Sequence, residues 1–236
     1  MKVKIPRFSP QIAYTYIIIC INNQLNIFIM KKVILSISAM LFAGVAFAQG
    51  NVSDVDQLGL LNGALVIQVG ASNNSDVDQI GIANVAIVGQ YGDDNESSVA
   101  QLGAGNVAVV TQIGDDNSST IAQGIWVGNL AVTTQIGAYN NSDVLQVGNF
   151  NDAYTTQFGA FNNSTTLQFG DDNTAATTQV GFFNNAATLQ LGWDNYSSIE
   201  QYGIGNFAAT AQFGNDHIST VTQTGFLNGS IVIQSN

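Results

Sequence analysis

The chain has 236 residues, of which only 9% are charged, with 16 acidic side chains against 5 Lys and Arg. All five basic residues and the single Cys20 lie before residue 49, whereas all sixteen acids lie after it. The segment after residue 49 is therefore not expected to bind nucleic acid, because phosphate contacts need Lys or Arg. It also has no cysteine, which excludes a disulfide framework.

Residues 30–48 (MKKVILSISAMLFAGVAFA) predict a secretory signal peptide. A start-like Met30 precedes two lysines, an apolar run and a small-x-small site that ends at Ala48, so we expect the mature chain to begin at Gln49. A transmembrane anchor is the alternative, but the apolar run is short for a span and no basic flank follows it. Residues 1–29 are interpreted as an upstream extension that precedes the true start, with a longer leader as the alternative.

Residues 49–236 form one repeat domain in which glutamine recurs on a fixed period. Every step is eleven residues except one of twelve, between Gln123 and Gln135, where one residue is inserted in GIWVGN. The repeated glutamines are Gln57, Gln68, Gln79, Gln90, Gln101, Gln112, Gln123, Gln135, Gln146, Gln157, Gln168, Gln179, Gln190, Gln201, Gln212, Gln223 and Gln234.

A Gly-x-x-Asn sequence follows almost every glutamine and predicts a tight turn. Glycine accepts positive φ, and asparagine tolerates left-handed geometry better than most residues. His217 replaces the asparagine once. The turn residues include Gly59, Asn62, Gly70, Asn73, Gly81, Asn84, Gly92, Asn95, Gly103, Asn106, Gly114, Asn117, Gly137 and Asn140.

Between the turns, side chains alternate with the period of a β-strand. In residues 106–112, every second residue is Asn106, Ala108, Val110 and Gln112, and this regular face should be interior. An eleven-residue period can also mean a right-handed coiled coil, but the Gly, Asn, Val, Ile and Thr content disfavours helix. We therefore predict an all-β fold, a β-solenoid or cross-β stack with two units per 22-residue layer and about eight layers.

The small interior residues divide the units into two sheets. Ala64, Ala86, Ala108, Ala131, Ala153 and Ala175 should lie on one sheet, and Ser53, Ser75, Ser97, Ser119, Ser142 and Ser164 on the other. In such a stack each glutamine lies above another, and their amides can form a ladder that offsets the cost of burial. The asparagine column can do the same. An Asn/Gln-rich disordered tract is the alternative, which the strict spacing disfavours.

The unit Asn-x-Ala-x-Val-x-Gln-x-Gly-x-x-Asn, iterated from about Ser53 to Gln234, resembles the curlin repeat of bacterial curli subunits. This resemblance implies a secreted functional amyloid of the extracellular biofilm matrix, exposed as a cell-surface fibre. It also implies export through a dedicated outer-membrane pore, a nucleator subunit as partner, and self-assembly. The regular last units favour the polymerising subunit over the nucleator.

Four acids gather on the variable, exterior face of the first layers, where Asp54 and Asp56 should lie beside Asp76 and Asp78. We interpret them as gatekeepers that slow premature assembly, with a plain solvated acidic surface as the alternative. No metal or cofactor is expected, because a calcium site needs roughly six converging oxygens.

Three other functions compete with fibre formation. An enzyme is disfavoured because the only histidine, His217, occupies a turn position and no base is positioned beside a nucleophile. An ice-binding solenoid would use outward threonine columns, such as Thr134, Thr156 and Thr178, but Glu200 interrupts that column. A non-polymerising adhesin would share the fold.

Overall fold

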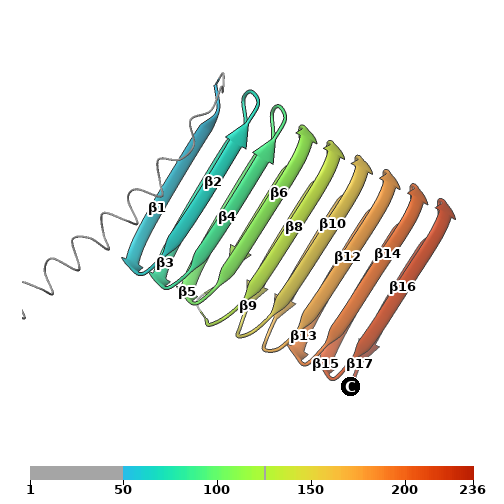
Figure 1. Cartoon of the computed structure of the whole chain (residues 1–236). Helices are drawn as coiled ribbons and strands as arrows, with labels where there is room; N and C mark the ends of the chain where they lie inside the picture. Colours follow the sequence, from blue (N-terminus) through green and yellow to red (C-terminus); the bar gives the residue numbers. More distant parts are fainter. Residues whose placement is uncertain (1–49, 125) are drawn as a thin grey trace, which may run out of the picture. The chain divides into compact units, whose positions relative to one another are not determined.

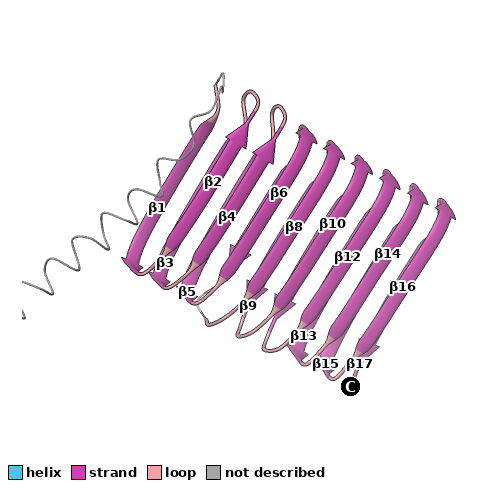
Figure 2. Cartoon of the chain, in the orientation of Figure 1, coloured by secondary structure: helices cyan, strands magenta, loops and turns pink. Residues whose placement is uncertain are grey.

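The computed structural model describes residues 50–124 and 126–236, which form one compact unit, and the expected leader and upstream extension lie outside this range. The described residues contain strands joined by short arches and no helix (Figure 2). In chain order the strands are β1 (Val52–Leu60), β2 (Gly63–Val69), β3 (Asn74–Ile82), β4 (Val85–Tyr91), β5 (Glu96–Ala104), β6 (Val107–Asp115), β7 (Ser118–Gln123), β8 (Leu130–Ala138), β9 (Asn141–Val147), β10 (Asp152–Ala160), β11 (Asn163–Phe169), β12 (Thr174–Phe182), β13 (Asn185–Trp193), β14 (Tyr196–Ile204), β15 (Phe207–Asn215), β16 (Ile218–Phe226) and β17 (Gly229–Ser235).

The strands form two stacked sheets, as the repeat predicts. The odd-numbered strands make a nine-stranded sheet in chain order and the even-numbered strands make an eight-stranded sheet (Figure 1). Each strand pairs in parallel with the strand two places later, so that Gln57 lies beside Gln79 and Gln157 beside Gln179. The expected all-β solenoid with a 22-residue layer is confirmed.

The inserted residue does not disturb this register. Gln112 pairs with Gln135 and Gln123 with Gln146, although both pairs are separated by 23 residues instead of 22. The extra residue is absorbed in the arch after β7, and Asn129 resumes the asparagine column at hydrogen-bond distance from Asn106. Pairing along the strands thus outweighs regularity of the arch.

The interior is a thin layer of small, β-branched and amide side chains. Asn106, Ala108, Val110 and Gln112 are all fully buried, whereas the residues between them are partly exposed. The alanine and serine columns lie on separate sheets in their expected registers, Ala64 beside Ala86 and Ser53 beside Ser75. Small side chains at this position let the two sheets approach closely.

The arches correct one sequence expectation. In the repeated Gln-x-Gly sequence the glycine has positive φ, for example 129° at Gly59 and 124° at Gly137. The asparagines do not take the left-handed conformation. The residue before each asparagine does, including bulky ones such as Phe161 at 57° and Tyr139 at 55°. The asparagine side chain is instead directed inward to bond the next layer, so its neighbour must make the turn.

Several interior hydroxyls have no hydrogen-bond partner among the described residues. Ser75, Ser97, Ser119 and Ser164 are in this group, whereas Ser142 lies 3.3 Å from the Thr133 hydroxyl. A buried hydroxyl without a partner costs free energy that an alanine avoids. The serine column is therefore not uniform in its contribution to stability.

Replacing Ser119 and Ser142 by alanine should have opposite effects. Ser119→Ala removes an unpaired hydroxyl and should leave the free energy of unfolding unchanged or raise it by up to about 1 kcal/mol. Ser142→Ala leaves the Thr133 hydroxyl without its hydrogen-bond partner and should lower the free energy of unfolding by about 1 kcal/mol. Urea unfolding of the freshly dissolved chain, followed by circular dichroism, measures both, and equal effects would contradict this reading.

Glycine is required in the arch because layers stack there without room for a side chain. A Cβ on Gly159 would collide with the carbonyl oxygen of Gly181 in the next layer, whereas one on Gly105 would meet no atom within 4 Å. Gly159→Ala should therefore destabilise the domain by about 3 kcal/mol, and Gly105→Ala by about 1 kcal/mol. The two urea midpoints, compared with wild type, test this; equal losses would argue against steric exclusion.

Candidate functional site: the amide ladders and the stack edges

The seventeen glutamines lie in two unbroken columns, one in each sheet. Except in the last residues of the columns, Gln223 and Gln234, each Nε2 donates to the Oε1 of the glutamine in the next layer. The distance is 2.6 Å from Gln57 to Gln79 and 2.9 Å from Gln179 to Gln201. The second N–H reaches a backbone carbonyl of the opposite sheet, as from Gln179 to the Asn163 oxygen at 2.9 Å. Each interior glutamine thus ties its layer to the next and the two sheets to each other.

The asparagines make a second pair of ladders that run the other way. The Nδ2 of Asn95 donates back to the Oδ1 of Asn73 at 2.9 Å and forward to the carbonyl of Gly114 at 2.7 Å. The Asn95 backbone N–H donates to the same Oδ1 at 3.1 Å. Each glutamine amide therefore donates to the next glutamine towards β17, whereas each asparagine amide donates to the neighbouring asparagine towards β1. Because the two ladders run in opposite directions, each end of the stack presents both donors and acceptors.

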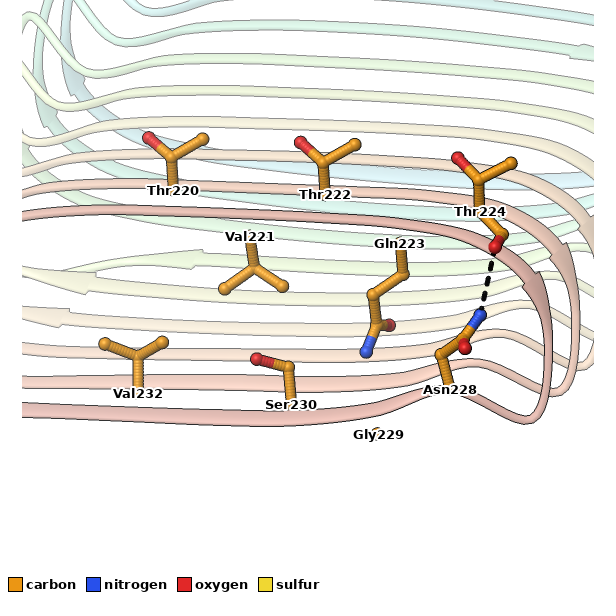
Figure 3. A pocket seen from close by; sticks show the side chains of 9 residues that line it. All are labelled: Thr220, Val221, Thr222, Gln223, Thr224, Asn228, Gly229, Ser230 and Val232. Carbon is orange, nitrogen blue, oxygen red and sulfur yellow. Dashed lines mark hydrogen bonds between the residues drawn. The ribbon is translucent and has the colours of Figure 1, made fainter.

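The last layer of the described residues is open. Val221 and Gln223 of β16 face Ser230 and Val232 of β17 across the interior, and a hollow lined by these side chains opens at the end of the stack (Figure 3). Asn228, which donates to the Thr224 carbonyl at 3.2 Å, lines one side of this hollow. Between residues 50 and 236 there is no proline and no Lys or Arg, the residues that usually blunt such edges.

The four acids expected on the first layers lie together on the outer face. Asp54 pairs with Asp76, and Asp56 with Asp78, across β1 and β3. Partial burial and the charges of Asp78, Asp54 and Asp56 raise the pKa of Asp76 above its ordinary value of 3.8. The charge on this face therefore opposes the compact stack near neutral pH.

The structure shows two further features of the arches. The Asp93 carboxylate accepts the Ala71 backbone N–H at 2.8 Å, so acids in the turns cap the preceding layer. Tyr139, Phe161 and Phe183 form a column of parallel rings 4.8 and 4.9 Å apart. Their identical place in units 22 residues apart was the available signal.

The described part of the chain contains no cluster of side chains that could hold a metal ion. No three His, Cys, Asp or Glu side chains converge there as metal ligands. His217 bonds the Phe213 carbonyl through Nε2 at 3.1 Å, and its backbone N–H bonds the Asn195 side chain. No helix within residues 50–124 and 126–236 is long and apolar enough to cross a membrane.

Within the described residues, a repetitive two-sheet stack held by amide ladders and with open strand edges defines a structural β-solenoid. The family model described as Curlin associated repeat matches residues 76–103, 98–124, 170–203 and 194–225. The chain belongs to the curlin-repeat family. A search of curated proteins gave no match to the chain. Both the family and the fold are structural and not enzymatic in character.

Removing one interior glutamine should break the ladder in both directions. In the wild type, Gln157 Nε2 donates to Gln179 Oε1 at 2.8 Å, and Gln179 Nε2 donates to Gln201 Oε1. Gln179→Leu leaves the Gln157 amide without its acceptor and the Gln201 carbonyl without its donor. We expect a loss of about 3 kcal/mol in the free energy of unfolding. Gln57→Leu, in the first layer, is the matched control and should cost about 1 kcal/mol. Urea unfolding compares the two, and equal costs would show that the ladder is not the cause.

The acidic face should make stability depend on pH. Because the folded-state pKa of Asp76 is raised, its contribution is most favourable below 3.8 and is lost as the pH rises through the raised value. Asp76→Asn should raise the urea midpoint at neutral pH and flatten its dependence on pH from below 3.8 upward. Asp143→Asn, which lies on the outer face of β9, is the control. An unchanged pH dependence in Asp76→Asn would contradict the assignment.

Proposed function

We propose that this chain is a secreted structural subunit that polymerises into extracellular curli-type amyloid fibres, which serve the biofilm matrix and surface adhesion. Membership of the curlin-repeat family points to a curli-associated, extracellular protein. The observation that supports polymerisation is that both glutamine ladders, one in each sheet, run without interruption to each end of the described stack.

An open strand edge templates another strand, and a second copy supplies an identical one. Growth by stacking continues the ladders that already hold the layers, so each added chain gains the bonds that an interior layer has. The regular last strands favour a polymerising subunit. An outer-membrane pore for export and a nucleator subunit are the partners that follow from this proposal.

The first test is assembly of residues 49–236 after dilution from denaturant, followed by thioflavin T fluorescence and by electron microscopy at the endpoint. The described residues belong to one compact unit with its own buried interior. A lag, a rise and unbranched fibres are expected. A β-rich monomer that stays soluble would sink the proposal and favour a non-polymerising adhesin or an ice-binding solenoid.

A single change at the edge provides a sharper control. The Phe207 backbone N–H donates to the Asn228 oxygen of the next layer, and Ala209 pairs with Ile231, so by alternation the Ile231 N–H faces the open edge. Ile231→Pro removes that donor without an internal loss, and a proline blocks strand addition. We expect a folded chain that does not extend wild-type seeds at this edge, whereas Ile231→Thr should extend them.

The ice-binding alternative fits the surface less well. Thr155 and Thr177 are buried, and the outward Thr178 pairs with Glu200. A carboxylate within the column interrupts the regular hydroxyl array that such a surface needs. Thermal hysteresis without fibres would nevertheless favour this function over polymerisation.

A further inference from the structure

We propose that copies of this chain join with a half-turn about the stack axis, so that β1 of one copy pairs with β16 of the next and β2 pairs with β17. This inference rests on the proposed function and specifies its partner surface as a second copy in a defined register. The nine-stranded and eight-stranded sheets then exchange at every junction.

The strand order of the described residues distinguishes a half-turn junction from a simple shift along the stack axis. β17 lies on the nine-stranded sheet and extends one strand beyond β16, which ends the eight-stranded sheet. A copy shifted along the axis without rotation would place β1 on β17. Its β2 would then lie two strand spacings above β16, with one unfilled strand position between them. Val221 and Gln223 would stay uncovered within the fibre, which leaves an interior amide unpaired.

A half-turn removes this vacancy. Consecutive strands run in opposite directions on opposite sheets, so the half-turn brings β1 into parallel alignment with β16 (Figure 1). With the glutamines in register, Gln57 lies on Gln223 and Gln68 on Gln234. Both amide columns then continue, since each glutamine at the β17 end donates towards the incoming copy. The solenoid runs on as if the next repeat unit had followed.

The exposed side chains match in this register. Leu65 and Ile67, 42% and 39% exposed, would cover Ile231 and Ile233, which are 68% and 69% exposed. Covering these side chains removes apolar surface from water and is favourable.

The acids are also placed favourably. In the half-turn register Asp54 and Asp56 lie on Thr220 and Thr222, whereas a purely shifted copy would set them on Ile231 and Ile233. A carboxylate against an apolar side chain loses water without gaining a partner. The two arrangements therefore differ in both apolar burial and carboxylate hydration.

The one irregular position in the asparagine column fits the same junction. His217 takes the place of an asparagine in the column. Because its Nε2 donates to the Phe213 carbonyl, its Nδ1 carries no proton in that tautomer and can accept a hydrogen bond. The Asn51 Nδ2 group is buried and has no acceptor among the described residues. In the half-turn register Asn51 lies on His217, which supplies that acceptor.

Cysteine pairs can distinguish the two registers, because residues 49–236 contain no cysteine. One variant carries Asp56→Cys with Thr222→Cys, and the matched control carries Asp56→Cys with Ile233→Cys. All three positions are exposed on outer faces, so both variants should fold. Neighbouring strands lie about 4.8 Å apart, which is within the Cα separation that a disulfide spans. Fibres are assembled under reduction, oxidised, dissolved and run on a non-reducing gel.

The expected result is a ladder of covalent oligomers from the Asp56/Thr222 variant and monomer from the control. Fibres in which only the Asp56/Ile233 variant crosslinks, or in which neither does, would overturn the half-turn junction and leave the proposed function standing. If wild-type and variant chains form no fibres at all, the proposed function fails and the junction fails with it.

Discussion

A buried primary amide must find a partner at every layer, and this constraint organises the whole domain. The interior glutamines and asparagines cannot reach water, so each depends on the same amide one strand spacing above and below it. That arrangement is possible only if the strands are in register, which fixes the 22-residue layer. It also explains why the inserted residue near Gly124 is displaced into an arch while Gln123 keeps its place beside Gln146.

The arches obey a second constraint, which is the close approach of backbones between layers. In all but the last layers, the glycine two residues after a glutamine lies where a side chain would collide with the backbone carbonyl of the next layer, as at Gly159. The left-handed turn itself is less demanding, since Phe161 and Asp172 both adopt it. The arch positions that vary are therefore exterior and can carry aromatic columns or acids, while the layer spacing stays constant.

The same regularity that stabilises the domain leaves its ends competent to grow. Ladders with opposed directions present donors and acceptors at both edges, and no proline or basic side chain between residues 50 and 236 interrupts strand addition. The charges around Asp76 oppose compaction of the first layers. Stability and the proposed assembly thus depend on the same set of hydrogen bonds.

The sequence by itself determined the period, the strand faces, the two sheets and the glutamine columns, because each depends on local alternation and on like residues at equal spacing. It did not assign the left-handed turn residue, since asparagine suits both a turn and a ladder. The sequence also allowed an asparagine ladder, and the stacked structure shows that the side chains of Asn73 and its equivalents bond across layers. The opposed directions of the glutamine and asparagine ladders are also visible only in the structure. So are the unpaired hydroxyl of Ser119, the contact of Ser142 with Thr133, and the strand edges that remain open among the described residues. These features depend on how neighbouring layers approach each other, and a single repeat unit carries no record of that.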